Sequence, residues 1–218
     1  MEKDRSARVI AIVALLVGVV GLSIGFAAFS SSLTISSSAE VSPDQSNFNV
    51  DFTSTSSGEI STSAIVPTKS PTTLTATSGA IDNSSDPTVT GLHATFTEPG
   101  QSVTYSFWAK NIGEYVAYLN SITIANAASS QTYKKCTAKG TTTQSLVDSA
   151  CSGISMTVEV GTEAATSSSV ATINNHSLAV NGYDPIVVTI SYATGSAQAD
   201  GDFDVAFGDI TLSYSSVD

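Results

Sequence analysis

Positive charge is scarce in this sequence of 218 residues. Eight lysines and arginines stand against 19 aspartates and glutamates, which gives a formal net charge of −11. Nucleic acids and anionic membrane surfaces are polyanions, and a protein surface with this charge repels both. We therefore expect no nucleic-acid partner. The same charge favours solubility and the binding of divalent cations.

Recognisable catalytic motifs are also missing. The sequence has no His-Glu-x-x-His zinc motif, no Gly-x-Ser-x-Gly nucleophile turn and no glycine-rich phosphate loop. Its two histidines, His93 and His176, are far apart in sequence and cannot supply a zinc site without help from carboxylates. Serine and threonine are so frequent that none stands out as a nucleophile. We expect no catalytic residue, no required cofactor and no enzymatic activity.

Cysteine occurs only twice, at Cys136 and Cys151. There is no Cys-x-x-Cys pair and no histidine nearby, so a metal site would lack ligands. Outside the cytoplasm the expected state of two such cysteines is a disulfide. Closing a loop of about 15 residues would stabilise the fold by roughly 3 kcal/mol through loop-closure entropy.

One long apolar run is present, from Val9 to Phe29, and it contains no charged residue. It follows a short segment with three basic residues, which is the layout of a secretory signal sequence. As a helix the run would be about 30 Å long, enough to cross a bilayer. It exceeds the usual apolar region of about 7–15 residues, so a cleaved signal peptide and a retained membrane anchor both stay open. Either one predicts a secreted or cell-surface protein, with transient or retained membrane contact through this run.

The rest of the chain has the pattern of an all-β protein. Residues 101–110 alternate between apolar and polar side chains, as a half-buried strand requires. We predict further strands at residues 33–35, 48–52, 155–160, 186–192 and 203–214, and consecutive antiparallel strands within residues 92–124. Residues 54–63 and 68–85, rich in serine and threonine, are expected as loops or exposed edge strands.

Two local features interrupt the strand pattern. Residues 141–150, inside the cysteine loop, can form one or two helical turns. In residues 203–214 the apolar positions change parity, with Val205 and Phe207 on one face and Ile210 and Leu212 on the other. One extra residue at Gly208-Asp209 would restore a common face, so we predict a β-bulge there.

These patterns predict one antiparallel β-sandwich of jelly-roll type over residues 41–218. Residues 1–27 are interpreted as a signal peptide or membrane-anchor helix, and residues 28–40 as a donor strand or linker.

One acidic cluster is a candidate for a bound cation. Asp200, Asp202 and Asp204 flank Gly201 before the last expected strand, and Asp209 follows. Oxygen ligands at alternate positions around a glycine can surround Ca²⁺, although the downstream glutamate of an EF-hand loop is missing. The alternative is a solvated acidic turn that discourages edge-to-edge strand pairing.

The end of the leader resembles a known family. Residues 25–30 read Gly-Phe-Ala-Ala-Phe-Ser, which is similar to the export signals of the TasA/camelysin family of bacterial biofilm-fibre proteins. Residues 99–107, with Asn-Ile-Gly at 111–113 and Ala-Tyr-Leu at 117–119, are similar to the central strands of that family. The resemblance implies cleavage between Ala27 and Ala28 by a dedicated signal peptidase.

The resemblance also implies a jelly-roll subunit that polymerises by donor-strand exchange, with other copies of the same chain as partners. The residues allow this, because Phe29, Leu33 and Ile35 share one parity, with Ser31 as the small exception. A strand of this kind can add to an exposed sheet edge and fill alternate pockets. The segment could instead pair within its own domain or serve as a linker from an uncleaved anchor.

Three functions follow from the sequence. The leading hypothesis is an exported structural subunit of an extracellular fibre or biofilm matrix. The alternative is a membrane-tethered surface module, an adhesin or glycan binder, for which Trp108 is a candidate contact residue because its parity opposes that of Phe107. A camelysin-like secreted metalloprotease is the third, and the absence of a zinc motif argues against it.

Overall fold

The computed structural model describes residues 48–84, 87–127, 130–166 and 170–216, which belong to a single unit, Pro43–Asp218. The apolar leader, the expected cleavage site at Ala27 and Ala28, and the donor residues Phe29, Leu33 and Ile35 lie outside the described residues. In the part that is described, no helix is long and apolar enough to cross a membrane.

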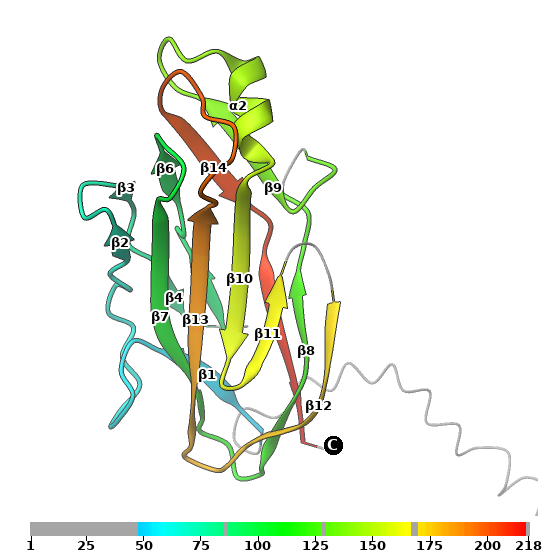
Figure 1. The fold of residues 1–218 in the computed structure, drawn as a ribbon. Helices are drawn as coiled ribbons and strands as arrows, with labels where there is room; N and C mark the ends of the chain where they lie inside the picture. The colour runs from blue at the N-terminus through cyan, green and yellow to red at the C-terminus, as the bar shows by residue number, and fades with distance from the viewer. Residues whose placement is uncertain (1–47, 85–86, 128–129, 167–169, 217–218) are drawn as a thin grey trace, which may run out of the picture. The chain divides into compact units, whose positions relative to one another are not determined.

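Antiparallel sheets make up most of the fold, so the all-β class predicted from the sequence is confirmed (Figure 1). The largest sheet, called here the main sheet, has the order β1-β7-β13-β10-β11, with β2 beside the free half of β7. Its strands are β1 (Val50–Thr53), β2 (Thr68–Ser70), β7 (Ser102–Asn111), β10 (Ile154–Val160), β11 (Glu163–Thr166) and β13 (Tyr183–Tyr192).

Three smaller sheets complete the fold. The upper sheet in Figure 1 has the order β3-β6-β14-β9, the lower sheet has the order β12-β8-β15, and β4 and β5 form a hairpin. Their strands are β3 (Thr75–Ala76), β4 (Ala80–Asp82), β5 (Thr88–Thr90), β6 (Ala94–Phe96), β8 (Ala117–Ile124), β9 (Lys134–Ala138), β12 (Val170–Leu178), β14 (Phe203–Phe207) and β15 (Ile210–Ser215).

The expectation that residues 92–124 are consecutive paired strands is only half right. The three strands β6, β7 and β8 exist, but they belong to the upper, main and lower sheets respectively. The long neighbour of β7 is β13, which pairs with it from Tyr183 opposite Lys110 to Ser191 opposite Ser102. Alternating side chains define a strand but do not choose its partner, and here the chain crosses between sheets after each strand.

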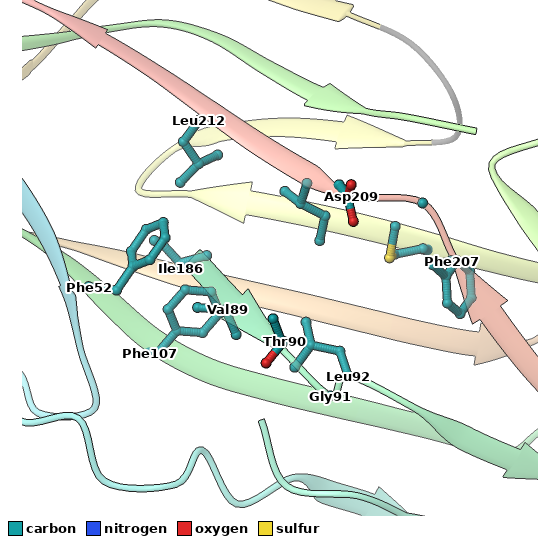
Figure 2. Close-up of a pocket in the computed structure, with 13 residues that line it drawn as sticks. Phe52, Val89, Thr90, Gly91, Leu92, Phe107, Ile186, Phe207, Asp209 and Leu212 are labelled. Atoms are coloured by element: carbon teal, nitrogen blue, oxygen red, sulfur yellow. The ribbon is translucent and has the colours of Figure 1, made fainter. Parts of the chain in front are cut away.

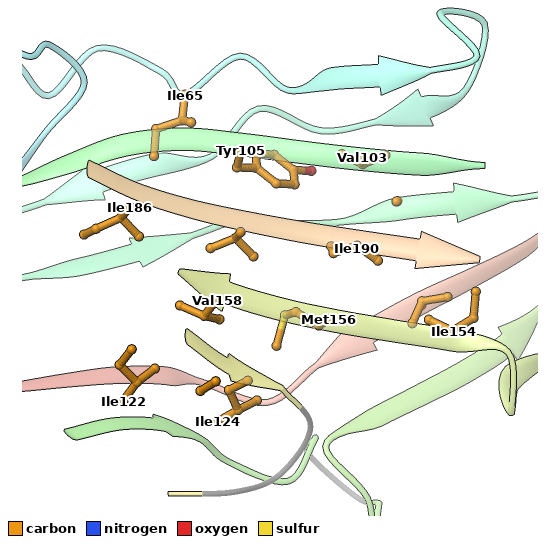
Figure 3. Packing of buried hydrophobic residues seen from close by; sticks show 14 of the residues in the cluster. Ile65, Val103, Tyr105, Ile122, Ile124, Ile154, Met156, Val158, Ile186 and Ile190 are labelled. Atoms are coloured by element: carbon orange, nitrogen blue, oxygen red, sulfur yellow. The ribbon is translucent and has the colours of Figure 1, made fainter. Parts of the chain in front are cut away.

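The core lies between the main sheet and the smaller sheets (Figure 3). The predicted inner face of β7 is buried, because Val103, Tyr105, Phe107 and Ala109 are almost completely inaccessible. The ring of Tyr192 on β13 meets Phe96 of β6 edge-on at 6.1 Å and Phe203 of β14 at 5.6 Å. These aromatic contacts fix the upper sheet on the main sheet.

The parity change predicted in residues 203–214 occurs at Gly208 and Asp209, but it is a break between two strands of different sheets and not the predicted β-bulge. The segment divides into β14 and β15 at Gly208 and Asp209, and the inward side chains pass from odd to even positions there. The segment between β14 and β15 is hydrogen-bonded to the segment between β8 and β9. Gly208 N donates to Tyr133 O at 2.9 Å, and Ala125 N donates to Asp209 O at 2.9 Å. A separate register irregularity lies within β15, between Ser213 and Tyr214.

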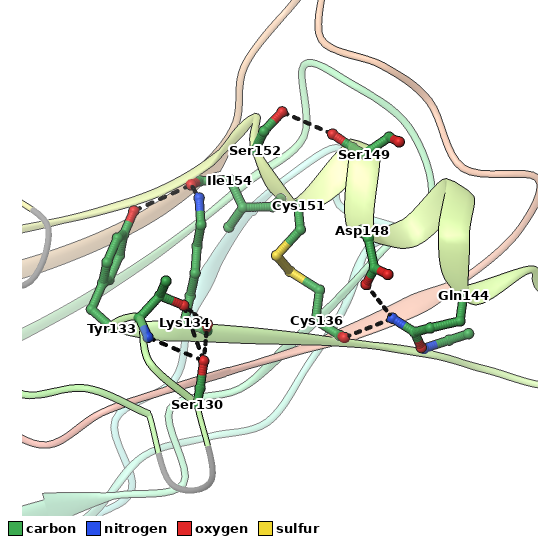
Figure 4. The surroundings of a disulfide bond; sticks show 12 residues. Ser130, Tyr133, Lys134, Cys136, Gln144, Asp148, Ser149, Cys151, Ser152 and Ile154 are labelled. Atoms are coloured by element: carbon green, nitrogen blue, oxygen red, sulfur yellow. Dashed lines mark hydrogen bonds between the residues drawn. A yellow bond between two sulfur atoms is a disulfide. The ribbon is translucent and has the colours of Figure 1, made fainter.

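The predicted disulfide and helical turns are both present (Figure 4). Cys136 on β9 is bonded to Cys151 at the end of helix α2 (Gln144–Cys151). Gln144 Nε2 donates to Cys136 O at 3.1 Å and to Asp148 Oδ1 at 2.7 Å. The helix is therefore fixed to β9 at both of its ends.

Candidate functional site

An apolar groove lies where two antiparallel stretches of chain separate. Strand β6 pairs with β14, from Phe96 opposite Phe203 to Ala94 opposite Val205. Beyond that pairing the two stretches continue as β5 and as β15, and these strands do not pair with each other. A groove of about 210 Å³ separates them (Figure 2).

The groove is lined mainly by apolar side chains. Its floor is formed by buried residues of the main sheet, namely Phe107, Met156 and Ile186. Its walls are formed by half-buried apolar residues that pack against the core, namely Phe52, Val89, Leu92, Phe207, Ile210 and Leu212. Half-buried apolar side chains gathered in one place indicate a surface that a further apolar group can cover.

Both walls of the groove are strand edges. Within the described residues, β15 pairs only with β8, and β5 pairs only with β4. Of the strands that the structure describes, none therefore lies beside β15 from Ile210 to Tyr214 on the side that faces the groove. An edge of this kind presents main-chain donors and acceptors to an incoming strand.

The β4–β5 hairpin is attached to β1 by the side chain of Asn83, which forms the two main-chain hydrogen bonds that a neighbouring strand would form. The amide of Asn83 accepts a hydrogen bond from Phe52 N at 3.2 Å and donates one to Phe52 O at 2.8 Å. These two bonds attach the hairpin to β1 of the main sheet. The opening in this layer is therefore on the β15 side of the hairpin, where the groove lies.

The chemistry of the groove suits binding rather than reaction. The polar side chains among its lining residues are Thr90 and Asp209, which are both exposed. With one carboxylate and one hydroxyl at the rim, the groove can receive apolar side chains and main-chain hydrogen bonds. That combination is the one an extended peptide segment supplies.

The acidic residues proposed for Ca²⁺ have separate partners. Asp200 accepts hydrogen bonds from N and Oγ1 of Thr143, at 2.9 and 2.7 Å, at the start of helix α2. These bonds, the backbone one first, hold the pKa of Asp200 below its ordinary value. Asp202 is exposed, and its carbonyl oxygen accepts a hydrogen bond from Lys139 N at 3.0 Å.

Asp204 lies on the outer face of the upper sheet with three neighbours. Thr95 Oγ1 donates to its Oδ1 at 2.6 Å, Lys139 Nζ is 3.3 Å away and His93 Nε2 is 3.5 Å away. Across the described ranges, no three His, Cys, Asp or Glu side chains meet in an arrangement that could hold a metal ion.

The two histidines lie in different parts of the fold. His93 lies just before β6. His176 lies in β12, next to a register shift at which Asn175 has a φ of +64°. His176 Nε2 is 2.9 Å from Asp184 Oδ2, so its partner is a carboxylate of the main sheet.

The groove itself was not foreseen from the sequence. Phe207, Ile210 and Leu212 were recognised as apolar strand positions, but their pattern does not differ from that of fully covered residues. Searches against known protein families, curated proteins and solved structures found no match to this chain. The functional argument therefore rests on the geometry of the groove and on the sequence.

Proposed function

We propose that this chain is an exported structural subunit of an extracellular fibre or biofilm matrix. In this proposal residues 28–36 of one copy insert as a strand into the apolar groove of the next copy. The groove carries the proposal, because an apolar channel bounded by two strand edges is the shape that a donated strand fills.

The dimensions of the donor segment suit the groove. From Phe29 to Ile35 an extended chain covers about 20 Å, at about 3.3 Å per residue. Strand β15 has six residues, which as an extended strand cover about 17 Å. Phe29, Leu33 and Ile35, with the small Ser31, would point to the floor around Ile186, and Ser30, Ser32 and Thr34 would point to solvent.

Strand insertion would also complete the expected architecture. A strand between β5 and β15 would join the β4–β5 hairpin to the lower sheet. The main sheet and this joined layer would then form a jelly-roll sandwich. A groove that the described residues leave open supports the view that the second layer is finished by another copy.

Export and assembly would be coupled in this scheme. Signal peptidase cleavage between Ala27 and Ala28 would release the protein and free the donor strand in the same step. The Cys136–Cys151 disulfide supports an oxidising environment outside the cytoplasm. The leader would then contact the membrane only during export.

The experiment compares the exported chain with a variant that lacks residues 28–36. The exported chain is expected to form filaments visible by negative-stain electron microscopy, and the shortened variant is expected to stay monomeric. The joint variant Leu33→Ser/Ile35→Ser should behave as the shortened one. Thr34→Asn, which changes the opposite face of the donor, is the matched control and should assemble. Filaments from the shortened variant would reject strand donation.

A second candidate, a membrane-tethered glycan-binding module, is supported by the outer face of the main sheet. Trp108 lies half-exposed there. On the same face one threonine from each of five strands lies in a single cross-strand row, formed by Thr68, Thr104, Thr189, Thr157 and Thr166. N-terminal sequencing of the exported protein separates the two candidates, because a tethered module would retain residues 9–29.

A further inference from the structure

Two loops at the lower end of the main sheet (Figure 1) carry large apolar side chains that are exposed to solvent. One loop joins β7 to β8 and the other joins β12 to β13. Four of their side chains are exposed, and together they are called the apolar tip: Ile112 (39%), Tyr115 (56%), Val116 (38%) and Val180 (40%). Only two other large apolar side chains of the described residues are comparably exposed, Val66 and Leu146.

The two loops are fixed to each other by one buried side chain. Asn111 Nδ2 donates to Tyr115 O at 2.8 Å in one loop and to Leu178 O at 3.0 Å at the start of the other. The main chain adds a bond from Asn181 N to Asn111 O at 2.9 Å. The tip is therefore preorganised, so that binding through it costs little conformational entropy.

The tip lies where the chain arrives from its N-terminal segment. The carbonyl oxygen of Asn49 accepts hydrogen bonds from Ile112 N at 2.9 Å and from Gly113 N at 3.1 Å. Residues 37–48 separate Asn49 from the donor segment, and the 13 steps from Ser36 to Asn49 cannot span more than about 47 Å. A copy that receives the donor strand must therefore lie within that reach of the tip.

We infer that the apolar tip is a second contact between copies of this chain. It packs on the same neighbouring copy whose groove receives residues 28–36, so the inference rests on the proposed function. If the donor strand were the only contact, the linker of residues 37–48 would leave the two subunits free to rotate relative to each other. A second contact near Asn49, where the linker joins the domain, fixes their relative orientation. Covering the tip also removes four large apolar side chains from water.

The charge of the tip favours a protein neighbour over a membrane. Glu114 is exposed between Ile112 and Tyr115, and the whole chain is strongly acidic. Anionic lipid headgroups would repel both. A neutral lipid surface remains the competing occupant, and the experiment below includes it.

The test uses the exported chain with Tyr115→Ser, Val116→Ser and Val180→Ser combined. Because truncating apolar contacts at the centre of an interface typically costs more than 1 kcal/mol, the lowest concentration that gives sedimentable filaments should rise by about tenfold or more. The control is Val66→Ser/Leu146→Ser, which removes apolar side chains that are exposed elsewhere on the surface. Since all these side chains are exposed, the thermal midpoint of each variant should stay within about 3 °C of the parent.

A second readout separates this inference from strand donation. In a Phe29→Cys/Leu212→Cys background, an inter-chain disulfide at high protein concentration reports that the donor strand has entered the groove. The tip variant should form this disulfide as the parent does. If the parent forms neither the disulfide nor filaments, the proposed function fails and the tip inference fails with it.

Two outcomes would overturn the tip inference alone. The first is an unchanged assembly concentration in the tip variant, while the parent forms both the disulfide and filaments. The second is flotation of the parent with neutral phosphatidylcholine vesicles that the tip variant loses, with assembly unaffected, which would assign the tip to a lipid surface.

Discussion

His176 and Asp184 join two sheets through a 2.9 Å contact between Nε2 and Oδ2. His176 belongs to β12 of the lower sheet and Asp184 to β13 of the main sheet. Tyr214 of β15 donates its hydroxyl to the same Oδ2 at 3.1 Å. Burial, with the nearby Asp184 charge, raises the pKa of Tyr214, so this hydroxyl remains a donor at neutral pH. Asp184 thus fixes β15, one wall of the groove.

Replacing this carboxylate should destabilise the fold. Asp184→Ala leaves the ring of His176 and the hydroxyl of Tyr214 without their buried acceptor. We expect the free energy of unfolding to fall by about 3 kcal/mol, as measured by urea denaturation. Asp202→Ala, at an exposed carboxylate, should change it by less than about 0.5 kcal/mol. Equal effects of the two substitutions would contradict the role given to Asp184.

The wall of the groove offers a test of strand donation that leaves the donor intact. Leu212→Asp places a charge where the donor's apolar face would lie, and it should abolish filament formation. Thr211→Asp places the same charge on the opposite, exposed face of β15 and should leave assembly intact. Sedimentation and electron microscopy measure both. If Leu212→Asp assembled at the same protein concentration as the parent, the groove would not be part of the contact between copies.

The turn between β14 and β15 requires glycine at position 208. A Cβ there would lie 2.1 Å from Ala125 O and 2.6 Å from Asn126 O, which are main-chain atoms that cannot move aside. Gly208→Ala should therefore destabilise by more than about 4 kcal/mol, seen as loss of the near-UV circular dichroism signal. The comparison is Gly195→Ala, whose Cβ would meet no atom within 4 Å at a φ of +81°. Its cost should be only about 1–2 kcal/mol.

The disulfide should contribute stability through the loop that it closes. Cys136 and Cys151 are separated by 15 residues, and losing the bond should reduce the free energy of unfolding by about 3 kcal/mol. The measurement is thermal or urea unfolding of Cys136→Ser/Cys151→Ser. Val147 and Ala150 of helix α2 are buried, so the helix should remain in the folded variant. An unchanged stability would show that helix packing alone fixes the loop.

Acid should weaken the contact between Asp200 and Thr143. The pKa of Asp200 is lowered in the folded chain by its hydrogen bonds from Thr143. A lowered folded pKa adds stability above the unfolded value of about 3.9, and this stability is lost as the pH falls through the folded value. The difference in unfolding free energy between the parent and Asp200→Asn should be constant above about pH 5 and shrink below about pH 4.

Urea unfolding at several pH values measures this difference. Thr143→Val removes one of the two hydrogen bonds to Asp200. The unfolding free energy of this variant should therefore depend less on pH than that of the parent. The prediction fails if the parent and Asp200→Asn differ equally at pH 7 and pH 3.

Local features of the sequence predicted the strands and the disulfide. Alternation at Val103, Tyr105 and Phe107 predicted the buried face of β7, and the parity change located the irregularity at Gly208, although as a β-bulge rather than as the end of one strand. The presence of only two cysteines, with the expected location outside the cytoplasm, predicted the Cys136–Cys151 disulfide. Each of these depends on neighbours within a short stretch of chain, because side-chain direction alternates along any strand.

Tertiary structure alone decided which strands pair and where an edge is left open. A main-chain ladder is the same for every sequence, so β6, β7 and β8 could enter three different sheets without a local sign. The contact of His176 with Asp184 and the separation of Leu92 from Leu212 across the groove depend on that pairing. An apolar residue at an open edge has the same pattern as one in a closed core, and only the packing around it shows which it is.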